Sequence, residues 1–237
     1  MVNKFSIVIP LFNEELNLDL LVGEIFLHLE IYNNQYEIIL VNDGSTDQTK
    51  SRIKYLKEKS PNIIRSIENI KNIGQSYSLI EGISFSKFAT IVVIDGDGQN
   101  NPKDIPILLK KYFSDENLFL VGGIRHKRKD SFVKIFSSKL ANIVRNFLLK
   151  DNCSDTGCSL KVFNKDIFLK FPTFNGIHRF LPALFTGYGV KTFFIKVDHR
   201  HRVYGYSKYG TFGRLFKGLR DLIKVAKIIK KFKRNRV

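Results

Sequence analysis

Three short apolar runs in the first half of the chain each stop abruptly at polar residues, and this pattern constrains the fold more than any other feature. The runs cover residues 6–10, 36–41 and 89–95 and are rich in β-branched residues. Runs of this length and composition predict buried strands. Segments with helical periodicity lie between them. Because strands that alternate with helices form largely parallel sheets with right-handed crossovers, the pattern predicts an α/β fold.

The rest of the chain extends this alternation. Further strands are expected near 63–67, 118–121, 160–163 and 190–197, and helices near 13–29, 48–59, 74–86, 102–109, 132–147 and 177–185. The buried face of the first helix is expected to hold Leu16, Leu20, Leu21, Ile25 and Leu29. The chain has no internal repeat and no linker, which favours a single domain.

Polar side chains follow the first, second and fourth predicted strands. They are Asn13 and Glu14, then Asp43, then Asp95, Asp97 and Gln99. The carboxyl ends of parallel strands meet at one edge of a sheet, where α/β proteins bind ligands. Asp95 and Asp97 repel each other unless a cation or donor lies between them, and hard oxygen ligands suit Mg²⁺ or Mn²⁺. The alternatives are an acidic turn at 95–99 and, for Asp43, a cap on the following helix.

Composition limits the class of partner. The chain has 237 residues and a formal net charge of +17, but residues 1–124 hold 12 Lys/Arg and 16 Asp/Glu. The positive charge therefore belongs to the second half, whose partner should be a membrane surface, nucleic acid or a phosphorylated substrate. We expect no spanning helix and no secretory signal, because no stretch of 18 apolar residues and no leader pattern is present. Cys153 and Cys158 are too few for a disulfide framework or a zinc site, and we expect both to be reduced and structural.

Several of these motifs together resemble a known family. The segments SIVIPLFNEE (6–15), VNDGSTD (41–47) and IDGDGQ (94–99) resemble family 2 glycosyltransferases of the GT-A fold. The segments DTGCSLKVF (155–163), HRFLPAL (178–184) and RVYGYSKYG (202–210) look like the dolichol-phosphate mannose synthase group, which includes bacterial polyprenyl-phosphate sugar transferases. The resemblance runs from about residue 5 to about residue 210. It implies a GT-A domain at 1–213, with a nucleotide-sugar half (1–124) and an acceptor half (125–213).

The resemblance implies a role for each strand-end residue. A nucleotide sugar would lie against Pro10, Phe12, Asn13, Glu14, Asp43 and Asp95. Asp97 and Gln99 would hold Mg²⁺ or Mn²⁺ together with the donor diphosphate, and Asp97 would thereby act in catalysis. The reaction would move a hexose, from GDP-mannose or a UDP-sugar, to a dolichyl or undecaprenyl phosphate with inversion.

The acceptor half would supply cations for the lipid phosphate. Arg125 and Arg202 would face phosphate groups as catalytic and acceptor-binding residues, with Ser207 and Lys208 in the same loop. Asp155, His178 and Arg179 would have supporting roles. The alternative is transfer to a saccharide hydroxyl in cell-envelope polysaccharide assembly, in which Asp155 would act as a general base.

The last segment, 214–237, predicts a basic amphipathic helix. Apolar residues at helical spacing form one face and Lys and Arg form another. We weigh two interpretations: a helix lying on an anionic membrane surface, and a helix docked on the core with a solvated basic face. The first places the protein peripherally at the cytoplasmic face, with a separate membrane protein as a further partner. An RNA-binding function is the remaining alternative, but the chain lacks a recognisable aromatic RNA-binding motif, so we expect no nucleic acid partner.

Overall fold

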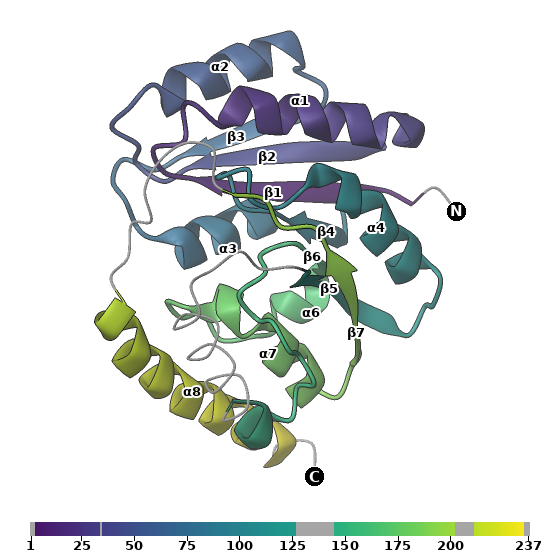
Figure 1. Cartoon of the computed structure of the whole chain (residues 1–237), viewed down its shortest axis with the longest axis vertical. Helices are drawn as coiled ribbons and strands as arrows, with labels where there is room; N and C mark the ends of the chain where they lie inside the picture. The colour runs from purple at the N-terminus through teal and green to yellow at the C-terminus, as the bar shows by residue number, and fades with distance from the viewer. Residues whose placement is uncertain (1–2, 34, 127–144, 202–210, 235–237) are drawn as a thin grey trace.

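The computed structural model describes residues 3–33, 35–126, 145–201 and 211–234, and in the last range the side chains of 218 and 220–234. A seven-stranded sheet runs through the molecule in the order β3-β2-β1-β4-β6-β5-β7 (Figure 1). The strands are β1 (Phe5–Leu11), β2 (Tyr36–Asn42), β3 (Ile64–Glu68), β4 (Thr90–Val93), β5 (Leu118–Arg125), β6 (Lys161–Asn164) and β7 (Lys191–Val197). Only β6 runs antiparallel to its neighbours, β4 and β5. The predicted α/β fold with a mostly parallel sheet is confirmed.

Helices cover both faces of this sheet (Figure 1). Their bounds are α1 (Leu18–Leu29), η1 (Glu30–Tyr32), α2 (Thr49–Lys59), α3 (Gln75–Phe85), η2 (Pro102–Asp104), α4 (Ile105–Phe113), α6 (Lys165–Phe168), η3 (Ile177–Arg179), α7 (Leu181–Gly187) and α8 (Thr211–Arg234). A short unlabelled helix covers 145–149. Helices α1, α2 and α4 contribute to one hydrophobic cluster, whereas α3, α6, α7 and α8 contribute to a second. The sheet is therefore the middle of three layers.

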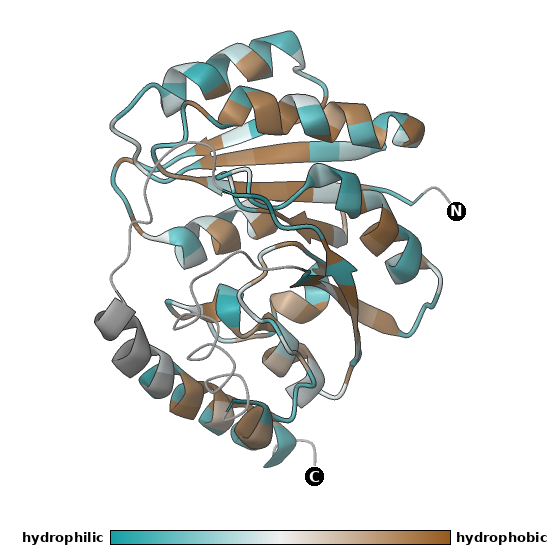
Figure 2. Ribbon diagram, viewed as in Figure 1, coloured by the Kyte–Doolittle hydropathy of each residue, from teal (hydrophilic) through white to brown (hydrophobic). Residues whose placement is uncertain are grey.

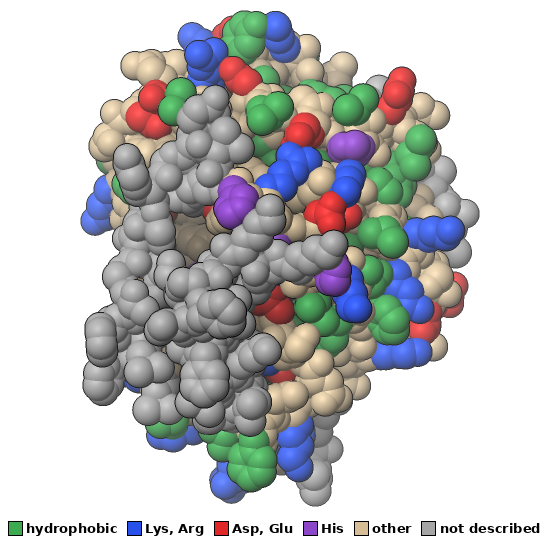
Figure 3. All heavy atoms as spheres, viewed as in Figure 1, with side chains coloured by type: hydrophobic (Ala, Val, Ile, Leu, Met, Phe, Trp, Pro, Cys, Tyr) green, Lys and Arg blue, Asp and Glu red, His purple; other side chains and the backbone are tan. Residues whose placement is uncertain are grey.

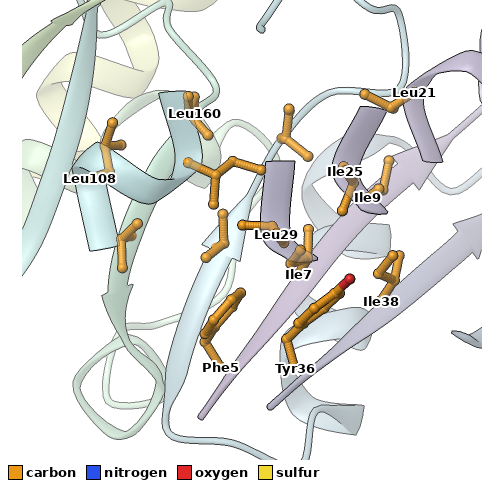
Figure 4. Packing of buried hydrophobic residues seen from close by; sticks show 14 of the residues in the cluster. Phe5, Ile7, Ile9, Leu21, Ile25, Leu29, Tyr36, Ile38, Leu108 and Leu160 are labelled. Carbon is orange, nitrogen blue, oxygen red and sulfur yellow. The ribbon is translucent and has the colours of Figure 1, made fainter. Parts of the chain in front are cut away.

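The central strands are buried on both faces, which explains their nearly continuous apolar sequences. In β1, Phe5, Ile7 and Ile9 point toward the α1 side, whereas Val8 belongs to the opposite cluster. The hydropathy colouring shows the same apolar strands between amphipathic helices (Figure 2). Phe5 stacks on Tyr36 with ring centroids 5.5 Å apart, and both lie beneath α1 (Figure 4).

The first helix differs from its prediction. It begins at Leu18 rather than at residue 13, and Leu16 and Leu20 are 61% and 57% exposed. The physical reason is that 13–15 form a loop whose backbone N–H groups bond to side chains of the 45–49 loop. The helical phase therefore starts later, and its buried residues are Leu18, Leu21, Val22, Ile25 and Leu29.

Smaller differences appear at other boundaries. Strand β5 continues four residues beyond its expected end and places Arg125 at its last position. The helix expected over 177–185 is split into η3 and α7. Most of the 132–147 stripe lies outside the described residues, but its last member, Phe147, is 81% exposed. That end of the stripe is not part of the core.

The described part of α8 docks on the core. Leu222, Val225 and Ile229 are buried in the cluster that also contains α7. Phe232 stacks on Tyr188 with ring centroids 3.6 Å apart. The exposed side of the helix carries Arg220, Lys224, Lys227, Lys230, Lys231, Lys233 and Arg234. Among the two interpretations of this helix, its described part matches the core-docked one with a solvated basic face.

No helix in the described ranges combines the length and the apolar character needed to cross a bilayer.

The packing of α8 predicts a large difference between two isoleucines. Ile229 is 8% exposed and touches Gly187, whereas Ile223 on the same helix is 50% exposed. We expect Ile229→Ala to lower the free energy of unfolding by about 2–4 kcal/mol, because it leaves a cavity. The matched Ile223→Ala variant should change it by less than about 0.5 kcal/mol. Urea unfolding measures both values, and equal effects would show that the helix is not docked.

Candidate active site at the carboxyl edge of the sheet

The loops after β1 and β2 are tied to each other at the carboxyl edge. The Asn13 side chain accepts from the Thr46 N–H at 2.8 Å, and the Asn13 N–H donates to Ser45 Oγ at 3.0 Å. Asn13 has φ 54°, a left-handed conformation that Asn tolerates better than most residues. Glu14, 9% exposed, accepts from the Asn17 side chain at 2.8 Å. Two of the residues expected at the nucleotide pocket therefore lie together in one fixed loop, directly after Pro10 and Phe12.

Asp43 anchors the loop that precedes α3. Its carboxylate accepts from the N–H groups of Ile73 at 2.8 Å and Gly74 at 3.0 Å, and its side chain is nearly fully buried. The alternative that Asp43 caps the following helix is wrong, because its carboxylate accepts from the loop before α3 and the N-cap of α2 is Gln48, without a side-chain cap bond. Gly74 has φ 94°, which a side chain would strain. Asp43 thereby aims the amino terminus of α3, with its partial positive charge, at this edge.

The loop after β4 brings two carboxylates to the same edge. Asp95 Oδ1 accepts from Gln75 Nε2, at the start of α3, at 2.7 Å. Asp97 is 9% exposed, and its Oδ1 accepts from the Gln99 N–H at 3.1 Å. A Cβ at Gly96 would collide with the Leu11 side chain, so this glycine lets the loop pack against the end of β1. The strand-end residues of β1, β2 and β4 thus form one edge, as the sequence predicts.

The donor set at this loop fits a divalent cation that a ligand helps to hold. Asp97 and Gln99 offer carboxylate and carboxamide oxygens within one tight turn. Within the described ranges, no group of three or more His, Cys, Asp or Glu side chains converges as a ready cation site. Mg²⁺ ordinarily needs only one or two protein carboxylates when substrate phosphates complete its shell. The residues present therefore fit a metal that binds together with a diphosphate.

A segment from the second half of the chain lies along this loop. The Arg200 N–H donates to the Gln99 carbonyl at 2.8 Å, and Asn100 forms an isolated β-bridge with His199. The Arg200 guanidinium donates to both oxygens of Glu24 on α1 at 2.8 and 2.9 Å. Arg202, Ser207 and Lys208 lie outside the described residues, but the chain that leads to them begins beside Gln99. Sequence analysis missed Arg200, because no motif separates it from other arginines of the basic half.

Arg125 and Asp155 form a bidentate ion pair at the end of β5. Arg125 Nε and Nη2 donate to the two Asp155 oxygens, each at 2.7 Å, and the Arg125 N–H donates at 3.1 Å. Their side chains are 14% and 7% exposed. Sequence analysis gave the two residues separate roles. Arg125 was expected to face a phosphate group, and Asp155 was expected to be a supporting residue or, in the alternative, a general base. The structure makes Asp155 the partner that fixes the plane and direction of the Arg125 guanidinium.

The segment 155–159 connects this ion pair to the loop at 95–99. Asp155 holds Arg125 at one end, and at the other end Ser159 Oγ accepts from the Asp95 N–H at 3.2 Å and the Asn100 side chain at 2.7 Å. A Cβ at Gly157 would lie 2.6 Å from Arg125 Nη2, so only glycine leaves room for the guanidinium. Residues 155–159 therefore fix the position of Arg125 relative to the loop that carries Asp95 and Asp97.

A second, buried arginine supports this segment, and sequence analysis missed it. Arg145 is 5% exposed and donates to Thr156 Oγ1 at 2.7 Å and to the Cys153 carbonyl. Its Nε lies 3.0 Å from an oxygen of Asp151, which is fully buried. Buried charges of this kind persist only when paired, so Arg145 and Asp151 hold the 151–156 turn in place. The sequence offered no signal, since both residues lie within an irregular charged region.

His178 and Arg179 contact different parts of the molecule. His178 Nδ1 lies 2.8 Å from Ser76 Oγ, which also accepts from the Gly176 N–H at 2.7 Å. Ser76 follows Gln75, the partner of Asp95, so His178 joins η3 to the amino terminus of α3. Arg179 instead pairs with Asp221 of α8 at 2.6 Å. A functional role for Arg179 would therefore act through the docking of α8.

Both thiols are buried and lack nucleophilic character. Burial raises the pKa of Cys153 and of Cys158 to about 11. A raised pKa keeps a thiol protonated at neutral pH, and the thiolate is the reactive form. We expect almost no reaction with a thiol reagent in the native protein at pH 7.5 and two equivalents after unfolding. Rapid labelling of the native chain would contradict this arrangement.

An open, mostly parallel sheet with carboxylates, glycines and a helix amino terminus at its carboxyl edge is typical of nucleotide-binding proteins. The sequence model described as "Glycosyl transferase family 2" matches residues 6–171. The chain therefore belongs to glycosyl transferase family 2.

Curated relatives match nearly the whole chain. The chain is 32% identical over 94% of its length to "Dodecaprenyl-phosphate galacturonate synthase" of Rhizobium johnstonii and covers 66% of that protein. It is 32% identical over 94% of its length to "Undecaprenyl-phosphate 4-deoxy-4-formamido-L-arabinose transferase" of an Enterobacter species and covers 67% of it. It thus spans about two thirds of the length of these relatives.

Two solved structures share the fold at lower identity. A mannosyltransferase from Pyrobaculum calidifontis, solved with GDP-Man and Mn²⁺, aligns with TM-score 0.65 and 17% identity over 93% of this chain and 64% of its own. Glucosyl-3-phosphoglycerate synthase from Mycobacterium tuberculosis, solved with Mn²⁺ and UDP, aligns with TM-score 0.68 and 16% identity over 94% and 78%. At these identities the likeness shows the fold.

Proposed function

We propose that this chain transfers a hexose from a nucleotide sugar to the phosphate of a polyprenyl lipid. The observation that carries the proposal is the 155–159 segment, which fixes the Arg125–Asp155 pair beside the Asp95–Gln99 loop. An arginine oriented in this way suits a phosphate, because guanidinium recognises phosphate through paired N–H donors. The names of the two curated relatives, both polyprenyl-phosphate enzymes, support the same acceptor class.

The donor would lie across the carboxyl edge of the sheet. Pro10, Phe12, Asn13, Glu14 and Asp43 are the residues that we assign to the nucleotide, and Asp95 is assigned to donor orientation. Asp97 and Gln99 would hold Mg²⁺ or Mn²⁺. When bound, the metal stabilises negative charge on the diphosphate. The amino terminus of α3, which Asp43 aims at this edge, adds a fixed partial positive charge.

The proposed reaction is a direct displacement at the anomeric carbon of the donor sugar. An oxygen of the acceptor phosphate forms a bond to the anomeric carbon while the bond to the diphosphate breaks, and the electron pair leaves with the nucleoside diphosphate. The acceptor is already ionised, so it needs no general base. It needs cations that let two anions approach, which is the role proposed for Arg125 and for Arg202, with Ser207 and Lys208 beside the latter. His178 would support the α3 terminus through Ser76.

Transfer to a saccharide hydroxyl would require Asp155 to take a proton. The Asp155 carboxylate instead accepts three N–H bonds from Arg125. Such bonds stabilise the carboxylate and make it a poorer base. This pairing favours the phosphate acceptor.

We further infer a peripheral location at the cytoplasmic face of a membrane. The exposed basic side of α8 supports attraction to anionic lipid headgroups. The apolar side of its described part is buried, so this part of α8 would meet a membrane through its charged side chains. A separate membrane protein remains a proposed partner.

A panel of nucleotide sugars tests the proposed function. The purified protein is incubated with each donor and undecaprenyl phosphate in detergent, with Mg²⁺, Mn²⁺ or EDTA. We expect one donor to give a lipid-linked sugar with metal and none with EDTA. Product formed only with saccharide acceptors would overturn the proposal.

A further inference from the structure

A groove lies between the carboxyl-terminal half of α8 and the short helix at 145–149. It has a volume of about 670 Å³ and is open on one side. Its lining is Leu148, Leu149, Lys150, Ala226, Ile229, Lys230, Lys233 and Arg234. Figure 1 shows the short helix beside the end of α8, far from the loop after β1.

The floor of the groove is apolar. Leu149 and Ile229 are buried at its base, whereas Leu148 is 50% exposed and the adjacent Phe147 is 81% exposed. Two adjacent large apolar side chains are thus exposed beside an apolar floor, a combination suited to contact with another apolar group. The α8 side contributes positions 226, 229, 230, 233 and 234, which form one stripe of the helix.

The rim of the groove is cationic. Lys150, Lys230, Lys233 and Arg234 are all exposed, and no Asp or Glu of the described residues lines the groove. Lys150 follows the short helix in a left-handed conformation, φ 51°, with its N–H bonded to the Asn146 carbonyl. Hydrophobic and basic side chains lie close together at this lower end of the molecule (Figure 3).

The groove is separate from the candidate active site. The carboxyl-terminal half of α8 contacts Gly187 and Tyr188, which precede β7 at the amino edge of the sheet. The carboxylates and Arg125 lie at the opposite, carboxyl edge. The α8 side of the groove therefore lies at the edge of the sheet opposite the carboxylates and Arg125.

We propose that this groove binds the headgroup of an anionic membrane phospholipid. The phosphate contacts the four rim cations, and the start of an acyl chain lies on Leu148 and Ile229. An apolar floor with a cationic rim complements both parts of such a lipid. The site adds a defined anchor, formed by one stripe of α8, to the general attraction of the basic side of this helix. The proposal does not depend on the identity of the donor or acceptor.

A matched pair of charge-reversal variants tests the site. Lys230→Glu/Lys233→Glu changes the groove, whereas Lys227→Glu/Lys231→Glu makes the same charge change on exposed positions of α8 that do not line it. Sedimentation with vesicles of phosphatidylcholine containing 30 mol% phosphatidylglycerol gives the apparent affinity. We expect the groove variant to weaken binding on the order of 100-fold or more, and the control, which reduces only the general attraction of the basic side, by about 10-fold or less.

Two further measurements separate binding in the groove from general charge attraction. Leu148→Ser should weaken vesicle binding several-fold without changing net charge, and thermal unfolding confirms that each variant is folded. Vesicles of phosphatidylcholine alone should not bind the wild-type protein. Equal losses in both charge variants would show diffuse attraction and overturn the site. Release by inorganic phosphate, beyond release by NaCl at equal ionic strength, would assign the rim to free phosphate and overturn it too.

Discussion

We expect Asp97→Asn to lower kcat by about 10²–10³-fold, the cost of losing one strong electrostatic contact to the reacting charge. Asp97 is nearly buried, and its Oδ1 already orders the turn through the Gln99 N–H. The substitution keeps the size of the side chain and removes its charge. Binding of the nucleoside diphosphate should also lose its dependence on Mn²⁺, which calorimetry measures without any turnover.

The control for this variant is Asp115→Asn. Asp115 pairs with the exposed Lys191 near the start of β5 and β7, at the amino edge of the sheet. The same chemical change there should leave kcat and Mn²⁺ dependence unaltered. If Asp97→Asn retains wild-type turnover, the metal is held elsewhere or is not used, and the assignment of Asp97 and Gln99 is wrong.

The second large effect concerns the Arg125–Asp155 pair. We expect Arg125→Ala to lower kcat/KM for the lipid phosphate by about 10²–10³-fold, and Asp155→Asn by about 10–100-fold. Because Asp155 holds both Nε and Nη2 of Arg125, its loss would misdirect the guanidinium rather than remove it. Asp155→Asn alone therefore cannot separate an orienting carboxylate from a base.

A double-mutant cycle separates these two roles. If Asp155 acts only by orienting Arg125, Asp155→Asn should have almost no added effect in the Arg125→Ala background. If Asp155 acts as a general base, the two losses should multiply. Two rate losses that multiply, together with a steep fall in rate at low pH that Asp155→Asn removes, would favour a saccharide hydroxyl as the acceptor.

Much of the fold could be predicted because local patterns and the buried sheet agree. The three apolar runs that end in polar residues became β1, β2 and β4, and their ends share one edge. The first helix was misplaced because periodicity alone cannot detect that the Asn13–Asn17 loop is held by residues about 30 positions away. Leu16 and Leu20 fit a helical face in sequence, yet they lie on the exposed side.

The candidate site could be predicted as a set of residue types but not as a set of pairings. Asp95, Asp97 and Gln99 are recognisable in the sequence because they follow an apolar strand as a polar turn. The Arg125–Asp155 pair joins residues 30 positions apart, and no spacing rule links them. Arg145 lies in no motif, and Ser159 lies in the 155–163 motif without a predicted role, so the contacts of both follow only from the path of the 150–160 segment. Similarly, the apolar face of α8 predicts a buried surface but does not say whether lipid or protein covers it.

The chemical form of the phosphate in the product tests the central claim most directly. The purified protein is incubated with undecaprenyl phosphate, its productive nucleotide sugar and Mn²⁺, and the lipid fraction is followed by ³¹P NMR. A sugar placed on the phosphate converts the lipid phosphomonoester signal into a phosphodiester signal, with nucleoside diphosphate released in equal amount, and this is the result that we predict. Consumption of the donor with an unchanged phosphomonoester signal would contradict transfer to a lipid phosphate.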